Sequence, residues 1–445
     1  MNIIQLTPGA GAMFCGNCLR DNALVASLRR LGHEALMLPL YLPLTLDERD
    51  ESAGLPVFYS GINVYLSQKS GLFTGAPGWL RDLLASRPVL KWAAGKAAKT
   101  RAQDLGEVTL SMLRGESGRQ ARELTELVGW LKSRPKPDVV CLSNALLAGM
   151  TRQLKAALGV PVLCTLQGED CFLDALPEPH RAECWDALTQ RAAEVDLFIA
   201  PSRYFADLMS RRLSLPADRV QVVYNGINLE AYDRAGPATV TPSPQERGDT
   251  TPVLGFFARM CREKGLDTLV EAYLELRRQG KKLKLRIGGS CGPADAAFVE
   301  MLRGRLRQAG VLGEVEFRPN LDHAAKVAFL RSLTVFSVPA AYGETFGLYL
   351  VEALAAGVPV VQPRTGAFPE LIEETGGGAL CPAGDSKGLA QAIGELLADP
   401  GRARGLGEAG RRAVFERFSA DSMARALLEA LRGVGQRRLH EAGCG

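Results

Sequence analysis

MNIIQLTPGAGAMFCGNCLRDNALVASLRRLGHEALMLPL, residues 1–40, has the pattern of a strand, a glycine-rich turn, a helix and a second strand. Residues 3–6 are a short apolar run, and residues 7–12 hold a proline and two glycines. The apolar positions that follow recur at the 3.6-residue spacing of a helix: Leu19, Ala23, Leu24, Leu28 and Leu31. Gly32 is suited to end that helix, and residues 35–40 predict a buried strand.

Similar alternation continues along the chain. Strand-like apolar runs cover residues 137–142, 160–166, 196–200 and 220–223, and then residues 253–257, 283–287, 315–317, 334–338 and 358–361. Helical patterns separate these runs. Uninterrupted apolar runs are typical of parallel strands that are buried on both faces. Between the two series, residues 236–252 hold four prolines and no apolar periodicity, which indicates a linker.

The two series predict an α/β protein with two doubly wound, Rossmann-like domains that face each other across a cleft. We expect an N-terminal domain over residues 1–235, with a mainly helical insertion over residues 77–131. After the linker, a C-terminal domain is expected over residues 253–415. The amphipathic pattern near the end predicts a final helix within residues 416–445 that crosses back to the N-terminal domain.

Composition excludes several other classes of protein. Apolar residues make up 47% and charged residues 23% of the chain, too apolar a balance for a disordered protein. A net charge of +4 is too small to indicate nucleic acid binding. The strongly apolar, uncharged stretch at residues 35–46 is too short to span a membrane, and the first eight residues lack the pattern of a secretion signal. Ten mostly isolated cysteines favour reduced thiols, so we expect a cytoplasmic protein.

AYGETFGLYLVEALAAG, residues 341–357, carries the clearest chemical signal. The pattern predicts a loop that holds Glu344, followed by a helix with Thr345 as its N-cap. The backbone N–H groups of residues 346–348 would then form an anion site, strengthened by the helix dipole. Glu352 lies eight residues after Glu344, or ~12 Å along a helix. This spacing is too long for the paired carboxylates of a glycosidase, so we expect separate roles for the two acids.

Residues 255–265 carry a second signal, at the start of the predicted C-terminal domain. Arg259 and Lys264 follow its first strand, at the edge where open α/β sheets bind ligands. Two cations beside a helix N-terminus suit a diphosphate, which Arg can bind through two hydrogen bonds at once. The chain has no Asp-x-Asp pair, so we expect these groups, rather than a metal, to neutralise a leaving group.

In combination, these motifs resemble those of the family 4 retaining glycosyltransferases of the GT-B fold. The resemblance rests on Glu344 and Glu352, on Arg259 and Lys264 in that order, and on the pair at 288–289, and it covers residues 195–431 best. It implies a hexosyltransferase whose donor is a nucleoside-diphosphate sugar of the UDP, GDP or ADP type, with no further cofactor and no metal. The acceptor would be a glycan, a lipid-linked sugar or a small molecule.

The resemblance also implies roles for single residues. Glu344, Arg259 and Lys264 would form the catalytic group around the donor sugar and its diphosphate, and Glu352 would bind the ribose. The other donor-binding residues would be Gly11, Gly288, Gly289, Ser290, Asn320, Leu321, Thr345, Phe346, Gly347 and Leu348.

On the acceptor or donor-sugar side, the candidates are Gln167, Glu169 and Asp170. Gln167 stands where the family often has His, and Gln can hydrogen-bond a sugar hydroxyl but cannot relay a proton near neutral pH. The two acids suit hydroxyl contacts and ordinary helix N-caps equally.

Other interpretations stay open. A non-catalytic nucleotide-sugar-binding protein on the same fold would explain the Gln at 167.

Cys15 and Cys18 form one C-x-x-C pair, which favours packing over a metal or redox site. The basic, Trp-containing residues 78–103 predict a solvated helix or, alternatively, contact with the inner face of a membrane. The turn at 9–11 lacks the third glycine of a dinucleotide-binding motif, which disfavours a nicotinamide oxidoreductase.

Overall fold

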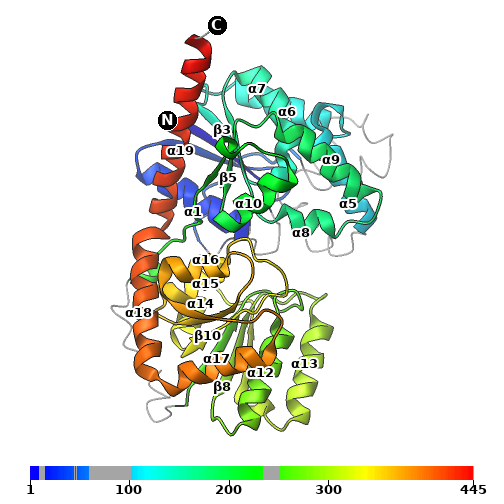
Figure 1. The fold of residues 1–445 in the computed structure, drawn as a ribbon. Helices are drawn as coiled ribbons and strands as arrows, with labels where there is room; N and C mark the ends of the chain where they lie inside the picture. Colours follow the sequence, from blue (N-terminus) through cyan, green and yellow to red (C-terminus); the bar gives the residue numbers. More distant parts are fainter. Residues whose placement is uncertain (10–15, 45, 47, 60–101, 234–250, 444–445) are drawn as a thin grey trace. The chain divides into compact units, whose positions relative to one another are not determined.

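The computed structural model describes residues 1–9, 16–44, 46, 48–59, 102–233 and 251–443. It divides into two compact units, Met1–Tyr224 with Met423–Gly445 (unit 1) and Asn225–Ser422 (unit 2). Each unit holds a parallel six-stranded sheet, with helices packed around it (Figure 1). The predicted fold class, two parallel α/β domains, is therefore confirmed.

The sheet of unit 1 has the strand order β2-β1-β3-β4-β5-β6. Its strands are β1 (Asn2–Thr7), β2 (Glu34–Pro39), β3 (Val139–Leu142), β4 (Val162–Thr165), β5 (Leu197–Ala200) and β6 (Val220–Val222). The helices are α1 (Gly16–Arg30), α5 (Ala102–Arg114), α6 (Ala121–Lys132), α7 (Thr151–Leu158), α8 (Glu169–Asp174), α9 (His180–Ala192), α10 (Arg203–Arg212) and, from Met423 onward, α19 (Ala420–Gly443).

Alternating side chains of these strands build two separate core layers in unit 1. Ile3 and Val139 belong to the layer that contains apolar residues of α1 and α19. Their neighbours Ile4 and Val140 belong to the layer formed with α5, α6, α7, α9 and α10. Because successive residues of a strand point to opposite faces, the continuous apolar runs need helices on both sides of the sheet. The C-terminal helix α19 packs, together with α1, on one of these two faces.

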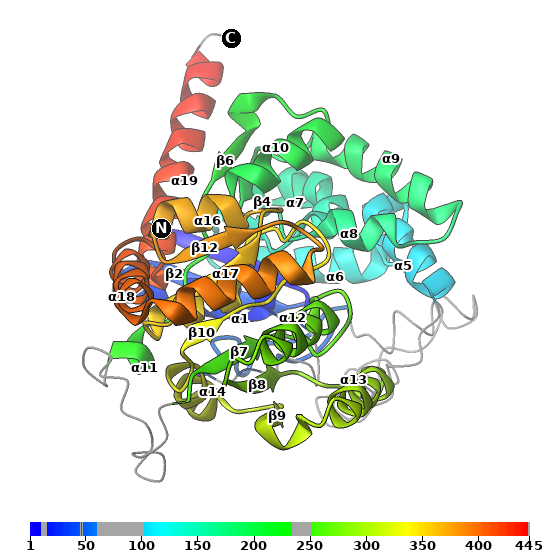
Figure 2. The same ribbon diagram turned by 60° about the horizontal axis from the view of Figure 1, so that its bottom comes forward.

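The sheet of unit 2 has the order β12-β11-β10-β7-β8-β9. Its strands are β7 (Val253–Phe257), β8 (Lys284–Gly289), β9 (Val315–Pro319), β10 (Val335–Phe336), β11 (Val360–Pro363) and β12 (Gly378–Cys381). The helices are α11 (Glu230–Asp233), α12 (Leu266–Arg278), α13 (Ala296–Gln308), α14 (His323–Arg331), α15 (Leu348–Ala355), α16 (Phe368–Thr375), α17 (Ser386–Ala398) and α18 (Pro400–Arg417). Helices α12 and α17 pack side by side (Figures 1 and 2).

Strand order in unit 2 marks one junction of the sheet. The chain starts at the central strand β7, moves outward through β8 and β9, and then returns to β10 on the other side of β7. The connections after β7 and β10 therefore lead away in opposite directions. In open α/β sheets, ligands bind in the crevice that such a reversal leaves at the carboxyl ends of the strands.

Several predicted segments lie outside the described residues. They include Gly11, Cys15, residues 77–101 of the insertion and residues 236–250 of the linker, and with them most of the basic segment 78–103. None of the eight cysteines that the structure describes forms a disulfide. In the same described part, no helix combines the length and the apolar character needed to cross a membrane.

Candidate functional site

The loops that follow β7 and β10 in unit 2 are held directly against each other. Gly265 caps α12 with a φ of +70°, and a Cβ there would lie 1.8 Å from the carbonyl oxygen of Pro339. The backbone N–H of Ala341 donates to the carbonyl of Glu263 at 3.0 Å. Only glycine accommodates both the left-handed backbone and this close approach. The contact brings Lys264 and Glu344 together at the junction of β7 and β10.

Lys264 and Glu344 form an ion pair with short hydrogen bonds. The Nζ atom of Lys264 donates to Oε2 of Glu344 at 2.6 Å and to the Tyr342 hydroxyl at 2.6 Å. The Tyr349 hydroxyl donates to the same carboxylate oxygen at 2.7 Å. Burial lowers the pKa of Lys264, but the Glu344 carboxylate outweighs it, so the pKa is raised above its usual value. Lys264 is therefore a fixed cation at neutral pH.

Helix α15 opens beside this pair, but later than predicted. Its first residue is Leu348 and its N-cap is Gly347 with a φ of +92°, so the N-cap prediction for Thr345 was wrong. Glycine fits this left-handed backbone far better than threonine. A Cβ at Gly347 would lie 3.7 Å from Cγ of Glu344. Because Glu344 lies before the helix, the helical spacing that we expected between it and Glu352 does not apply.

A third loop fixes the backbone of Glu344. The N–H of Ala367 donates to the carbonyl of Glu344 at 2.8 Å. A Cβ at Gly366 would lie 2.4 Å from the Glu344 nitrogen, so the loop after β11 packs on Glu344 without a side chain between them. The loop after β11 thus holds the backbone that carries the Glu344 carboxylate, and the residue is 8% exposed.

Arg259, the second predicted cation, is engaged by an acid that the sequence did not single out. Its Nη2 donates to Oδ1 of Asp295 at 2.9 Å, and its Nε lies 3.2 Å from both carboxylate oxygens. The Asp295 side chain is 8% exposed, whereas that of Arg259 is 57% exposed. The carboxylate therefore binds one side of the guanidinium and fixes its direction, while most of the Arg259 side chain stays accessible to solvent.

The loops after β8 and β9 join the same edge of the sheet. Gly289 has a φ of +118°, and a Cβ there would lie 1.9 Å from the carbonyl oxygen of Ala258. The N–H of Asn320 donates to the Gly289 carbonyl at 2.8 Å, and its side-chain oxygen accepts from the N–H of Cys291 at 3.1 Å. The backbone carbonyl of Ser290 accepts a hydrogen bond from the N–H of Met260 at 2.8 Å. Backbone contacts therefore connect the predicted nucleotide-binding residues, with Leu321 following directly after Asn320.

Glu352, predicted to bind a ribose, lies within α15 and pairs with a buried lysine. The Nζ atom of Lys326, on α14, donates to Oε1 of Glu352 at 2.8 Å. The two side chains are 8% and 17% exposed. The lysine balances the charge of a carboxylate that the fold has largely removed from water.

In unit 1, the loop after β4 carries three predicted residues with different surroundings. Glu169 accepts backbone N–H groups from Ala145 at 2.7 Å, Gln167 at 2.8 Å and Gly168 at 3.0 Å. Burial raises the pKa of Glu169 although these backbone hydrogen bonds lower it. The N-cap of α8 is Gly168, so the N-cap role predicted for Glu169 was wrong; its carboxylate instead ties the loops after β3 and β4 together.

Gln167 and Asp170 differ from Glu169, because each keeps a buried polar atom without a partner in the described part of the chain. These atoms are Nε2 of Gln167 and Oδ1 of Asp170. Asp170 is 7% exposed, and burial raises its pKa. A buried polar atom without a hydrogen-bond partner destabilises the folded protein. A ligand hydroxyl that hydrogen-bonds to either of these atoms would remove that cost.

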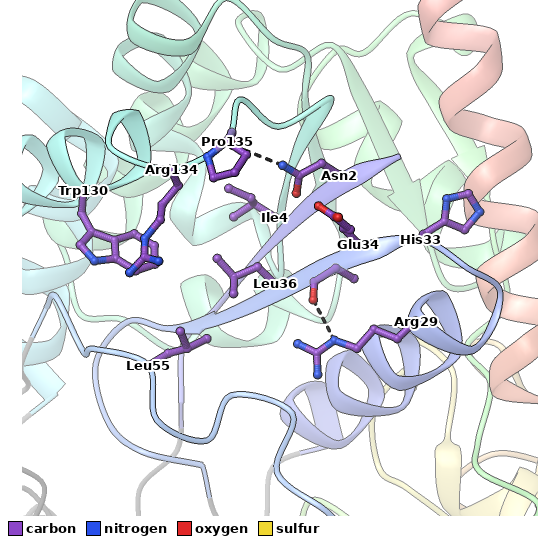
Figure 3. Close-up of a pocket in the computed structure, with 11 residues that line it drawn as sticks. Asn2, Ile4, Arg29, His33, Glu34, Leu36, Leu55, Trp130, Arg134 and Pro135 are labelled. Atoms are coloured by element: carbon purple, nitrogen blue, oxygen red, sulfur yellow. Dashed lines mark hydrogen bonds between the residues drawn. The ribbon is translucent and has the colours of Figure 1, made fainter.

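A pocket of about 460 Å³ opens elsewhere in unit 1 (Figure 3). Asn2 and Glu34, at the starts of β1 and β2, line it together with Trp130 in the last turn of α6 and Arg134 just after that helix. It therefore lies at the amino ends of the strands, opposite the edge that carries Gln167 and Asp170. Arg29, which also lines the pocket, donates to the carbonyl of Ala35 at 2.9 Å.

Sequence reasoning missed four residues that contact the predicted ones: Asp295, Lys326, Tyr342 and Tyr349. Tyr342 and Tyr349 flank Glu344 in the quoted segment, so their proximity to it was a usable signal. Asp295 and Lys326 had none, because they lie 36 and 26 residues from their partners. Among the described residues, no three His, Cys, Asp or Glu side chains gather as a metal site would need.

Both halves of the chain match families of known proteins. Residues 241–413 match the family described as "Glycosyl transferases group 1", and residues 94–231 match "Glycosyltransferase Family 4". D-inositol 3-phosphate glycosyltransferase of Xylanimonas cellulosilytica is 32% identical over 59% of this chain and 62% of its own length. Alpha-maltose-1-phosphate synthase of Mycolicibacterium smegmatis is 33% identical over 57% of this chain and 67% of its own length. The matched regions span about two thirds of the length of these two curated relatives.

Solved structures share the fold across the whole chain. HepE of Anabaena, in complex with UDP, superposes with a TM-score of 0.68 at 18% identity and covers 97% of this chain and 100% of its own. Sucrose-phosphate synthase of Thermosynechococcus elongatus gives a TM-score of 0.67 at 21% identity, with 99% and 100% covered. Sequence motifs, fold and family matches agree: the chain belongs to glycosyltransferase family 4 and has the GT-B fold.

Proposed function

We propose that this protein transfers a hexose from a nucleoside-diphosphate sugar to an acceptor hydroxyl, with retention of configuration. The observation that supports this most is the Lys264–Glu344 pair beside the N-terminus of α15, at the strand-order reversal of unit 2. HepE, which shares the fold, was solved with UDP and with UDP-glucose. UDP-glucose is therefore the first donor to test, and the acceptor class stays as broad as a glycan, a lipid-linked sugar or a small molecule.

In this proposal, the diphosphate lies against Lys264, Arg259 and the first N–H groups of α15. The bond between the anomeric carbon and the phosphate oxygen breaks, and these fixed positive groups stabilise the charge that develops on the leaving diphosphate. The acceptor oxygen bonds to the anomeric carbon on the same face, and its proton passes to the departing phosphate oxygen. Glu344 accepts hydrogen bonds from the sugar hydroxyls, and Glu352 from the ribose.

No side chain has to act as a metal ligand or as a nucleophile in this scheme. Proton transfer to the phosphate is also compatible with Gln167, which cannot take up a proton near neutral pH. We therefore assign Gln167 and Asp170 to hydroxyl contacts, through the buried atoms that lack partners in the described structure. Glu169 is left out of this group because backbone N–H groups already occupy its carboxylate.

A thermal-shift panel with UDP, GDP, ADP and TDP tests donor binding. We expect one nucleoside diphosphate at saturating concentration to raise Tm by about 2 °C or more, since ligands that bind only the folded state stabilise it. The matching nucleotide sugar should then be hydrolysed or transferred. No shift with any of the four would contradict the proposal, whereas binding without turnover would identify a non-catalytic nucleotide-sugar-binding protein.

Asp295→Asn tests the direction of Arg259. The amide keeps the shape of the side chain but loses the ion pair, so we expect KM for the donor to rise with little change in kcat. Because Arg259 is largely exposed, the pair contributes little and the rise should be about 3- to 5-fold. Steady-state kinetics over a range of donor concentrations measure this. A lower KM would show instead that Asp295 competes with the diphosphate for Arg259.

A further inference from the structure

Tyr349 lies at the second position of α15, where aromatic neighbours hold its ring. Its centroid is 6.4 Å from that of Phe336, on β10, and 6.4 Å from that of Phe368, at the start of α16. The Lys264 ammonium lies 5.4 Å from the same ring centroid. A ring packed among these groups has little rotational freedom, so the direction of its hydroxyl is set by the fold.

The hydroxyl of Tyr349 is directed at the carboxylate of Glu344, with an O–O distance of 2.7 Å. Burial and the adjacent Glu344 carboxylate raise the pKa of Tyr349 well above its usual value. The phenol therefore keeps its proton near neutral pH and donates to the carboxylate. A hydrogen bond to a charged acceptor is among the stronger ones in proteins.

Tyr342 has a different geometry, although it belongs to the same cluster. Its hydroxyl is 2.6 Å from Nζ of Lys264 but 3.5 Å from Oε2 of Glu344. Tyr342 thus contacts mainly the cation, whereas Tyr349 contacts the carboxylate. Lys264 contacts both, and it is the group that a diphosphate would attract.

We propose that Tyr349 is a positioning residue that holds the Glu344 carboxylate in place when Lys264 turns to the diphosphate of the donor. In the structure, Oε2 accepts from Lys264 and from Tyr349 at nearly equal distances. When the ammonium moves to a phosphate oxygen, the tyrosine keeps one strong hydrogen bond on the carboxylate. Glu344 then retains its orientation toward the sugar hydroxyls. This inference rests on the proposed function, because it concerns how Glu344 meets the donor.

Tyr349→Phe removes this hydroxyl and leaves the ring in place. We expect kcat for hydrolysis of UDP-glucose, or of the nucleotide sugar that the panel identifies, to fall about 10-fold. The rise in Tm caused by UDP should equal that of the wild type, because Lys264 and Arg259 are unchanged. Tyr273→Phe is the matched control. Tyr273 is buried in α12, and its hydroxyl donates to the carbonyl of Leu283 at 3.4 Å and interacts with the side chain of Arg277. The kcat of this variant should equal that of the wild type.

Each outcome of the comparison between Tyr349→Phe and Tyr273→Phe either supports or overturns the positioning role of Tyr349. A kcat for Tyr349→Phe equal to that of Tyr273→Phe would overturn the positioning role. So would a kcat loss accompanied by an equal loss of UDP binding, since that pattern indicates a general disturbance of the site. If the wild-type protein itself neither binds a nucleoside diphosphate nor turns over its sugar, the proposed function fails first, and the role of Tyr349 fails with it.

Discussion

Replacing Lys264 by methionine should lower kcat/KM for the nucleotide sugar by about 100-fold and weaken the binding of UDP as well. Methionine keeps the length and the apolar stem of the side chain but removes the ammonium. That ammonium is the cation that the structure places at the junction of β7 and β10, 2.6 Å from Glu344. Both the bound diphosphate and the charge that develops in the transition state lose one of their positive partners. Initial rates and UDP thermal shifts measure the two effects.

Two further variants make the Lys264 result interpretable. Lys281→Met removes an exposed lysine of the same unit and should leave both readouts at the wild-type level. Lys264→Arg keeps the charge in a planar, longer group, so it should retain part of the UDP binding but less of the turnover. Equal rates for Lys264→Met and Lys281→Met would contradict the assignment of Lys264 to the diphosphate.

Glu344→Gln should also reduce turnover by about 100-fold, but with the opposite effect on nucleotide binding. The neutral amide cannot balance the Lys264 ammonium, which becomes available to the diphosphate. UDP affinity should therefore stay at the wild-type level or increase, while the sugar loses the carboxylate that its hydroxyls contact. Isothermal titration with UDP and initial-rate kinetics separate the two quantities.

Glu408→Gln serves as the control for this charge change, because Glu408 is exposed on α18. A joint loss of UDP binding and turnover in Glu344→Gln would mean that the glutamate only supports the loop. The contrast between the two partners is the informative part. Loss of the Lys264 charge should reduce both UDP binding and turnover, whereas loss of the Glu344 charge should reduce turnover alone.

Much of the fold was predictable because each buried parallel strand leaves a continuous apolar run. The run at 253–257 became β7 with the same bounds. β12 was missed because it begins at Gly378 and lies half-exposed at the sheet edge, where neither apolar content nor alternation is strong. The start of α15 was placed too early because threonine is a better N-cap in general than the left-handed Gly347 that the close packing here requires.

The candidate site was predictable only as a set of residues. Lys264 and Glu344 were both expected near a diphosphate, but nothing in the sequence shows that they bind each other across 80 residues. Such a contact depends on strand order and on how closely two loops can pack. In this protein, Gly265 permits that packing, because any Cβ at this position would lie 1.8 Å from the carbonyl oxygen of Pro339.

A crystal structure of the protein soaked with UDP tests the central claim most directly. We predict a diphosphate oxygen within hydrogen-bond distance of Nζ of Lys264, with the second phosphate facing Arg259 and the N-terminus of α15. The bond between Tyr349 and Glu344 should persist in that complex, while Lys264 has moved from the carboxylate toward the phosphate. UDP bound elsewhere, with the Lys264–Glu344 pair unchanged, would contradict this account.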